Sequence, residues 1–166
     1  MFILFGGILF GLLVIDLVTK WLTYDGSVIV LISNFLSIHP MKNQGVAFGW
    51  FYGSGLILTI LTGVLIAGVS AFYIWQAKDN KGKKGTTWMH IAFAFFLAGA
   101  IGNWFCRLFY NNSVRDFISF DFFPFIFNFA DVWLTVGAIM LGIYFLFMYE
   151  EKKKPVAEVA HEENPS

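Results

Sequence analysis

Charged residues are scarce in this 166-residue sequence, and neither sign of charge is in excess. Only 13% of the residues are charged, whereas 58% are hydrophobic and 20% are aromatic, which is far more apolar than a soluble domain. Eleven lysines and arginines balance eleven aspartates and glutamates, so the formal net charge is zero. This balance excludes the basic field that binds nucleic acid and the acidic excess typical of disordered chains. The function is therefore to be sought in a membrane.

Cysteine is scarce, and the usual signatures of metal or nucleophilic sites are missing. Cys106 is the single cysteine, so an internal disulfide is excluded. His39, His90 and His161 lie far apart in the sequence, and no Cys/His spacing resembles that of a metal site. Cys106 has no histidine nearby in sequence and no G-x-S-x-G string is present, which disfavours a nucleophilic hydrolase. We expect neither a metal nor an organic cofactor.

Long apolar stretches predict an all-α polytopic membrane protein with four transmembrane helices, because about 20 apolar residues are needed to cross the hydrocarbon core. We expect the spans at about residues 1–22, 49–75, 88–110 and 127–149. A cleaved signal peptide in place of the first span is disfavoured, since no positive region precedes it and three further spans follow. Residues 1–149 would form one membrane domain, and the polar, proline-containing stretch 150–166 would be a disordered cytoplasmic tail.

Lysine and arginine counts in the loops predict the orientation, because positive residues stay preferentially in the cytoplasm. Seven of the eleven lie between spans two and three or after span four: Lys78, Lys81, Lys83, Lys84, Lys152, Lys153 and Lys154. Both termini are therefore expected in the cytoplasm. The start Met1-Phe2-Ile3 carries no basic anchor, which would fit an N-terminus that is truncated or misassigned.

Two segments outside the spans, residues 23–48 and 111–126, would lie on the opposite, extracytoplasmic face. Ser27–Ile32 is rich in β-branched residues, and Asp116–Asp121 partly alternates polar and aromatic residues, so we expect short strands in a small platform on the membrane surface. Phenylalanine-rich loops at this surface indicate contact with lipid or a lipid-bearing ligand. Ordinary interfacial anchoring by aromatic residues explains them equally well.

Polar residues within or beside the spans would share one depth in the membrane. Such residues are costly there and are therefore candidates for function. With the expected orientation, all of them face the outer interface: Asp16, Thr19, Lys20, Asn43, Asn103, Arg107, Asp116, Asn128 and Asp131. A single polar pocket explains this pattern more readily than several unrelated sites.

Helical spacing pairs some of these residues. Asp16 and Lys20 are four residues apart with the acid first, which favours an ion pair that acts as a structural clasp at the membrane boundary. Asn103 and Arg107 share one face of the third span, where arginine would offer fixed donors to a carboxylate or a carbonyl. For this second pair, structural support and substrate binding both stay open.

Asp116 and Asp131 are candidates for a catalytic pair. No basic residue lies at helical spacing from Asp131, and Asp116 has only its neighbour Arg115. Two carboxylates within a few ångströms in a poorly hydrated site cannot both ionise, so one acts as general acid while the other activates water. Pairing of the aspartates with Arg107 or Lys20 is the alternative, because a spacing of 15 residues does not demonstrate proximity.

Five strings that contain these residues match, in chain order, the motifs D-x-x-T-K, N-x-G-x-A-F/W-G, A-G-A-x-G-N-x-x-D-R, V-D-F-I and F-N-x-A-D. They are Asp16-Leu17-Val18-Thr19-Lys20, Asn43-Gln44-Gly45-Val46-Ala47-Phe48-Gly49, Ala98-Gly99-Ala100-Ile101-Gly102-Asn103-Trp104-Phe105-Cys106-Arg107, Asp116-Phe117-Ile118 and Phe127-Asn128-Phe129-Ala130-Asp131. A four-span chain with these strings resembles the lipoprotein signal peptidases, the type II signal peptidases of bacteria.

This resemblance implies a membrane aspartic endopeptidase of the bacterial cytoplasmic membrane, with its active site at the outer leaflet. Asp116 and Asp131 would be the dyad that cuts diacylglyceryl-modified prolipoproteins just before the lipidated cysteine. The implied partners are these substrates and membrane lipid, without nucleic acid or metal. The resemblance also implies the residues that line or support the site: Asn43, Gly45, Asn103, Arg107 and Asn128, with Asp16 and Lys20 as support.

Three features depart from the family pattern. Cys106 stands where the D-R motif has aspartate, which would lower activity if that carboxylate is needed. Arg115 stands where valine is usual, and its charge is expected to lower the pKa of the adjacent Asp116 carboxyl. The 15-residue spacing of the aspartates is short for the family, which implies a trimmed loop before span four.

Two other functions stay open from the sequence. One is an impaired paralogue that binds lipidated peptides but cleaves poorly, because Cys106 has broken the polar network. The other is a small membrane transporter in which paired acids relay ions. A transporter would favour charges near the bilayer midplane, whereas here they gather at one interface.

Overall fold

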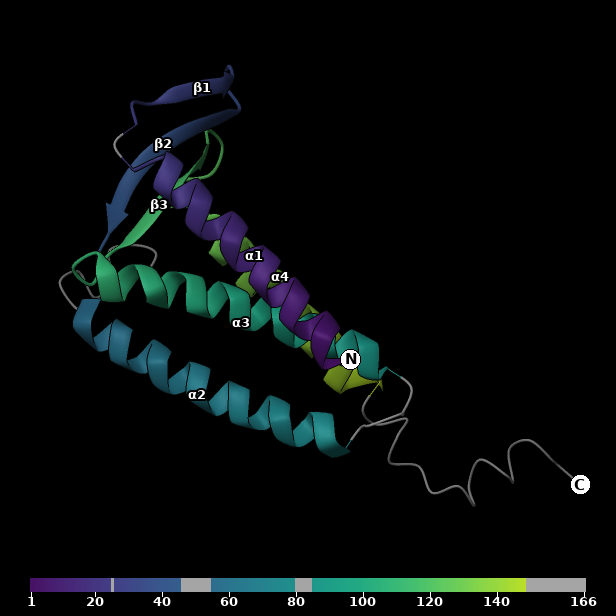
Figure 1. The fold of residues 1–166 in the computed structure, drawn as a ribbon. Coiled ribbons are helices and arrows are strands. Elements are labelled where there is room, and N and C mark those ends of the chain that lie inside the picture. Colours follow the sequence, from purple (N-terminus) through teal and green to yellow (C-terminus); the bar gives the residue numbers. More distant parts are fainter. Residues whose placement is uncertain (25, 46–54, 80–84, 149–166) are drawn as a thin grey trace, which may run out of the picture.

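The computed structural model describes residues 1–24, 26–45, 55–79 and 85–148, and the expected tail 150–166 lies outside these ranges. The described residues contain four long helices, α1 (Phe2–Leu22), α2 (Gly55–Asp79), α3 (Thr86–Phe109) and α4 (Phe129–Ile143), the last continued by a π-helical turn, η2 (Tyr144–Met148) (Figure 1). Each helix, with α4 counted to Phe147, is long and apolar enough to cross a membrane.

The bounds of α4 and α2 differ by a few residues from the expected spans. α4 begins two residues after the expected start at 127, because Asn128 caps it. α2 continues to Asp79, past the expected end at 75, and residues 49–54 of the expected second span lie outside the described ranges. The prediction of a four-span membrane protein with a small strand-containing part is confirmed.

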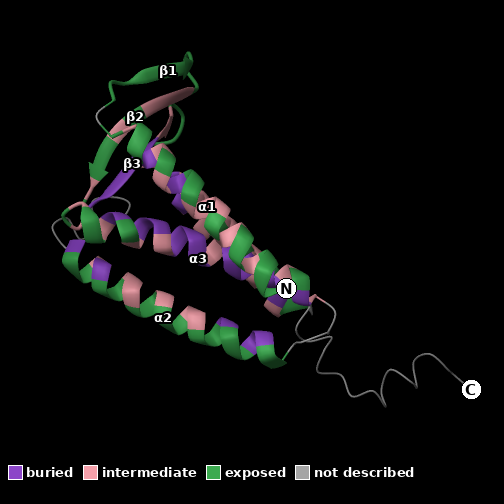
Figure 2. Ribbon diagram, viewed as in Figure 1, coloured by how far each residue is buried: buried purple, intermediate pink, exposed green. Residues whose placement is uncertain are grey.

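α3 is the central helix of the bundle. It packs against α1, α2 and α4, and most of its length is buried while α1 and α2 expose broad apolar faces (Figure 2). Small residues let these helices approach closely, as is common where helices pack in a membrane. A Cβ atom added to Gly99 would collide with the backbone of Ala130 and Leu134, so glycine is required where α3 meets α4.

A four-stranded antiparallel sheet forms the second part of the fold. Its strands β1 (Ile29–Ile32), β2 (Leu36–Asn43), β3 (Val114–Phe120) and β4 (Ile126–Phe127) lie in that order. β1 and β3 overlap the two expected strands, whereas β2 and β4 were not expected from the sequence. The pairing of β2 with β3 shifts register between Ile38 and Met41, where Pro40 has no N–H to donate.

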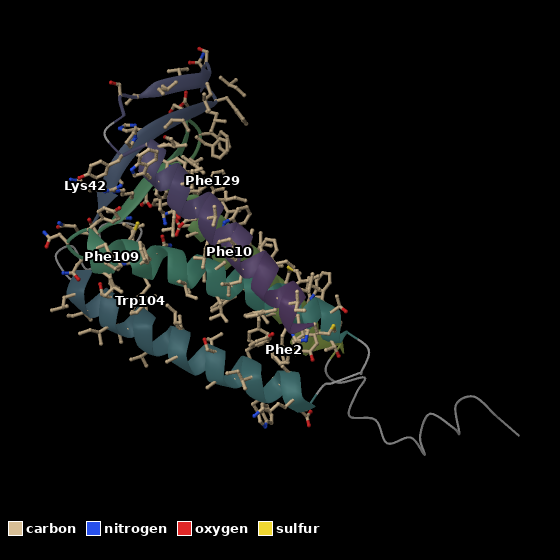
Figure 3. The ribbon with its side chains drawn as sticks, in the orientation of Figure 1. Phe2, Phe10, Lys42, Trp104, Phe109 and Phe129 are labelled. Atoms are coloured by element: carbon tan, nitrogen blue, oxygen red, sulfur yellow. The ribbon has the colours of Figure 1, made fainter. Side chains whose placement is uncertain are left out.

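The sheet sits at the end of the bundle where α1 and α3 end and where α2 and α4 begin (Figure 1). Lys42 of β2 and Phe129 lie towards this end, and Phe2 lies at the opposite end (Figure 3). The opposite end holds a core cluster that includes Tyr73, whose hydroxyl lies 2.8 Å from His90 Nδ1. The predicted polar residues of spans one, three and four lie near the ends of α1 and α3 and at the start of α4. They therefore all lie at the sheet end.

Candidate active site

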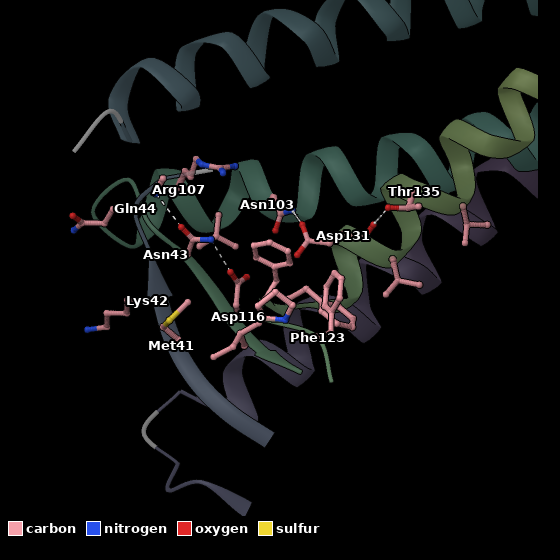
Figure 4. Close-up of a pocket in the computed structure, with 18 residues that line it drawn as sticks. Met41, Lys42, Asn43, Gln44, Asn103, Arg107, Asp116, Phe123, Asp131 and Thr135 are labelled. Atoms are coloured by element: carbon pink, nitrogen blue, oxygen red, sulfur yellow. Dashed lines mark hydrogen bonds between the residues drawn. The ribbon is translucent and has the colours of Figure 1, made fainter. Parts of the chain in front are cut away.

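A pocket of about 930 Å³ opens where β2 and β3 meet α3 and α4 (Figure 4). Asp116 of β3 and Asp131 of α4 both line it. The other polar residues that line it are Lys42, Asn43, Gln44, Asn103, Arg107 and Thr135. One side is apolar and is formed by Phe123, Pro124, Phe125, Ile126, Phe127, Val132 and Val136. The two aspartates thus face one partly apolar space.

Strand geometry directs the Asp116 carboxylate into the pocket. Val114 and Asp116 line the pocket while the intervening Arg115 does not, as expected because alternate side chains of a strand share a face. Asn43 Nδ2 donates to Asp116 Oδ2 at 2.9 Å, and Asn128 Nδ2 donates to Asp116 Oδ1 at 2.6 Å. Both oxygens of a carboxylate that is only 3% exposed are thereby held by amide groups.

Burial, and next the nearby charge of Asp131, raise the pKa of the Asp116 carboxyl to about 6. The hydrogen bonds from Asn43 and Asn128, and the charge of Lys20, act in the opposite direction because they favour the ionised form. The expected effect of Arg115 is wrong. Its guanidinium lies on the other face of β3, and the pKa of Asp116 is raised by burial and not lowered by this neighbour.

Helix capping directs the Asp131 carboxylate. The Asn128 side chain accepts from the backbone N–H of Asp131 at 3.1 Å, and Asp131 Oδ2 accepts from the backbone N–H of Asn128 at 3.0 Å. Asn103 Nδ2 donates to the other oxygen, Asp131 Oδ1, at 2.7 Å (Figure 4). The first turn of α4 and one residue of α3 therefore fix this side chain together.

A buried polar network connects the two aspartates with the end of α1. Asn103 Oδ1 accepts from Lys20 Nζ at 2.9 Å and from Asn128 Nδ2 at 3.2 Å. Lys20 Nζ also pairs with Asp16 Oδ2 at 2.8 Å, and Asp16 Oδ1 accepts from the backbone N–H of Ala130 at 2.9 Å. Asp16 and Lys20 are 0% and 2% exposed and do not line the pocket. They lie behind it and hold the start of α4.

Close approach at Gly102 accommodates this network. A Cβ atom on Gly102 would lie 2.5 Å from Asp16 Oδ2 and 3.3 Å from Ala130 Cβ. Since both neighbours are buried, any larger residue at this position would push the carboxylate away from its partners. The glycine is thus part of the reason why the ion pair fits between α1, α3 and α4.

The structure brings all the predicted site residues together at one end of the bundle. Gly45 supports the site through its backbone N–H, which donates to Asn43 Oδ1 at 3.0 Å and orients that amide. Arg107 lines the pocket on the same helix as Asn103. Within the described ranges the one ion pair joins Lys20 to Asp16, so the alternative pairing of the aspartates with Arg107 or Lys20 is not found.

Cys106 does not line the pocket, and its sulfur takes no part in the hydrogen bonds that join Lys20, Asn103 and Asn128 to the two aspartates. Its side chain is 1% exposed, and its sulfur receives a hydrogen bond from the backbone of Arg115. Sequence reasoning missed several residues that line the pocket: Met41, Lys42, Gln44, Val114, Phe123, Pro124, Phe125, Ile126, Phe127, Val132, Thr135 and Val136. For Thr135, the spacing of four residues from Asp131 in a helix is a signal that would have indicated it.

The fold and the site define a class of protein. A membrane-spanning bundle presents two carboxylates from different elements to one pocket, which is the arrangement of a membrane aspartic peptidase. The described residues hold no group of three or more His, Cys, Asp or Glu side chains that could bind a metal ion. Comparison with known proteins identifies the family within this class.

The chain matches the family model of signal peptidase (SPase) II over residues 8–147. It is 35% identical over 148 residues to the lipoprotein signal peptidase of Clostridium novyi, an alignment that covers 84% of this chain and 94% of that protein. It is 34% identical over 147 residues to the lipoprotein signal peptidase of Fusobacterium nucleatum subsp. nucleatum, which covers 86% of each chain. The chain therefore belongs to the signal peptidase II family, a family of aspartic peptidases.

Solved structures agree with this assignment. A bacterial membrane enzyme determined by the in meso method at 2.3 Å resolution matches with a TM-score of 0.74 at 29% identity, over 90% of this chain and 91% of that chain. A second, determined by the same method at 1.9 Å resolution, matches with a TM-score of 0.72 at 28% identity, over 86% of this chain and 92% of that chain. The transporter function is not favoured by these relatives.

Proposed function

We propose that this protein cuts diacylglyceryl-modified prolipoproteins just before the lipidated cysteine, with Asp116 and Asp131 as the catalytic pair. One observation carries the proposal: the two carboxylates line the same pocket, and hydrogen bonds from neighbouring amide groups hold each of them. The names of the relatives support the substrate class, since they are lipoprotein signal peptidases.

The proposed chemistry is general acid–base hydrolysis of one peptide bond. The raised pKa of Asp116 favours it as the carboxyl that keeps a proton, and Asp131 is then the base that takes a proton from water. The water oxygen adds to the carbonyl carbon while Asp116 protonates the carbonyl oxygen. When the tetrahedral intermediate collapses, the C–N bond breaks and Asp131 gives the proton that it took from water to the leaving amine of the lipidated cysteine. Asp116 recovers a proton from the hydroxyl that becomes the new carboxyl group.

The neighbouring polar side chains would position the substrate. Arg107 and Asn43 offer donors to peptide carbonyls along the pocket, and Asn103 and Asn128 keep the two carboxylates in place. Asp16 and Lys20 support this arrangement from behind. These roles follow from where each group lies in relation to the two aspartates.

Membrane lipid is the second partner that we propose. The sheet exposes an aromatic cluster in which the rings of Phe35 and Phe122 lie 5.6 Å apart, and Phe122 is 70% exposed. Every residue of β1 is an exposed aliphatic side chain. Such a surface beside four spans is suited to the lipid interface, where substrate acyl chains remain in the bilayer while the peptide enters the pocket.

We further propose that the protein lies in the bacterial cytoplasmic membrane with both termini in the cytoplasm and the pocket at the outer leaflet. The lysines of the sequence support this orientation, because seven of the eleven positive residues lie between spans two and three or after span four. Lys78 in the last turn of α2 lies at the end of the bundle opposite the sheet. The pocket would then meet a substrate that has already crossed the membrane.

Cleavage of a purified diacylglyceryl-modified prolipoprotein in liposomes tests the proposed function. We expect the wild-type protein to produce the shorter product on a gel, and the Cys106→Asp variant to be no more active than wild type. The reason is that Cys106 does not line the pocket and takes no part in the hydrogen bonds that hold the two aspartates. Inactive wild type with activity in Cys106→Asp would instead establish the impaired paralogue. No product from either folded protein would contradict the proposal.

The pH dependence offers a separate prediction. The fall of kcat/KM with rising pH reports loss of the essential proton in the free enzyme, and for Asp116 it is expected near pH 6. The Asn43→Ala variant removes a donor that stabilises the ionised form, so the pKa of Asp116 rises and the fall moves to higher pH. We expect a shift of about one pH unit, the size of one hydrogen bond to a charged group.

Ser37→Ala is the matched control for Asn43→Ala. Ser37 lies on the same strand, β2, but pairs with Ser119 and does not line the pocket. Its pH profile is expected to match that of wild type. A shift of the Asn43→Ala profile to lower pH, or no shift, would show that this amide does not act on the carboxyl that controls the reaction.

A further inference from the structure

Arg115 is held in an unusual way on the face of β3 that points away from the pocket. Its guanidinium carbon lies 3.4 Å from the centre of the Tyr24 ring and 3.6 Å from the centre of the Tyr110 ring. The two ring centres are 6.2 Å apart, so the planar cation lies between them. The residue is 6% exposed, and its Nε atom has no hydrogen-bond partner among the described residues.

The two rings belong to the ends of two transmembrane helices. Tyr24 follows Thr23, the C-cap residue of α1, and Tyr110 is the C-cap residue of α3. Arg115 Nη1 also donates to the backbone carbonyl of Lys20, in the last turn of α1, at 3.5 Å. A cation is favourable at such a helix C-terminus. Arg115 therefore fastens one strand to two helix ends at once.

The contacts of Arg115 lie on a part of β3 that pairs with only one other strand. β2 pairs with β3 from Val114 to Asp116, but β4 pairs with β3 only at Ile118 and Ser119. The second edge of β3 beside Asp116 therefore has no strand partner within the described residues. The Arg115 guanidinium supplies contacts to the bundle at this point of the strand.

We propose that Arg115 is a positioning residue, whose place between Tyr24 and Tyr110 sets where Asp116 stands in relation to Asp131. The inference rests on the proposed function, since it assigns to Arg115 a part in the geometry of the catalytic pair. Adjacent residues of a strand move together, so a shift of Arg115 changes the direction of the Asp116 carboxylate. The rings, and not the charge alone, are the essential partners.

The first test is the kinetics of the Arg115→Met variant, which keeps an apolar stem of similar length but removes the cation. We expect kcat for each folded enzyme to fall by about 10- to 100-fold, the cost of misplacing a catalytic group by a fraction of an ångström to an ångström. KM is expected to stay within about two-fold of wild type. A purely stabilising role would lower only the amount of folded protein, measured by thermal unfolding.

The second test needs no substrate. Infrared titration of the Asp116 carboxyl, identified by its loss in Asp116→Asn, is expected to move to lower pH in Arg115→Met. Burial is the largest cause of the raised pKa of Asp116, and the charged groups that act on it are Asp131, Lys20 and Arg107. A displaced carboxyl is less buried and lies further from Asp131, so both causes of the raised pKa weaken. This readout keeps the inference testable even if the wild-type protein cleaves no prolipoprotein, a result that would contradict the proposed function alone.

Variants of the rings complete the design. Tyr24→Phe keeps the ring face and is expected to retain most of the activity, whereas Tyr24→Leu is expected to lose kcat as Arg115→Met does. Arg115→Lys is expected to recover only part of it, because a compact ammonium does not fill the space between two rings. The inference is overturned if Arg115→Met keeps both the wild-type kcat and the carboxyl titration, or if Tyr24→Leu matches Tyr24→Phe.

Discussion

Replacement of Asp131 by asparagine is expected to lower the rate of prolipoprotein cleavage by about 10³-fold, and Asp116→Asn is expected to do the same. Asparagine keeps the size of each side chain but neither donates an acidic proton nor removes one from water. Because the two carboxyls act as a unit, the double variant is expected to be no slower than either single variant. A gel assay of purified protein in liposomes measures the product.

Asp121→Asn is the matched control, because this aspartate is exposed in the turn after β3 and does not line the pocket. It is expected to cleave at the wild-type rate. Thermal unfolding of each variant shows whether a loss of activity reflects chemistry or folding. Cleavage by Asp131→Asn at a rate close to that of Asp121→Asn would remove Asp131 from the catalytic pair.

The second large effect is expected at Lys20. The Lys20→Met variant leaves the Asp16 carboxylate buried without its cation and Asn103 Oδ1 without one of its donors. Loss of one partner of a buried ion pair costs about 3–5 kcal/mol of folding stability. Because Asp16 also accepts from the backbone N–H of Ala130, at the start of α4, cleavage activity is expected to fall with stability. Unfolding in detergent measures the stability.

Two further variants separate the ion pair from a general effect of lysine removal. The double variant Asp16→Asn with Lys20→Met removes both charges, so it is expected to be more stable than Lys20→Met alone. Lys78→Met removes an exposed lysine of α2 and is expected to leave stability unchanged. If Lys20→Met unfolds at the same point as Lys78→Met, the buried pair contributes nothing to the fold.

Several parts of the fold could be predicted from the sequence because they depend on local composition. Apolar stretches long enough to cross a bilayer are visible directly, and the acid-first spacing of Asp16 and Lys20 indicates a helical pair. The polar residues near the span ends also indicate one shared depth. These predictions concern positions along single helices, which need no knowledge of how the helices pack.

Other parts could not be predicted because they depend on contacts between distant segments. β2 was missed since its sequence, with Pro40 in the middle, lacks the alternation of a strand, and its partner β3 lies more than 70 residues further on. The prediction that Arg115 lowers the pKa of Asp116 is wrong, because residues adjacent in sequence do not necessarily bring their charged groups together. In a strand, neighbouring side chains point to opposite faces, so the Arg115 guanidinium meets two aromatic rings.

The sequence by itself determined a four-span membrane protein, the family to which it belongs, and the residues from which a site is built, because hydrophobic length and motif order are properties of the chain. Only the tertiary structure decided that Asp116 and Asp131 face one pocket, that Asn43, Asn103 and Asn128 hold them, and that Cys106 lies outside. The physical reason is that these contacts join β2, β3, α3 and α4, whose relative positions follow from packing and from no local pattern of residues.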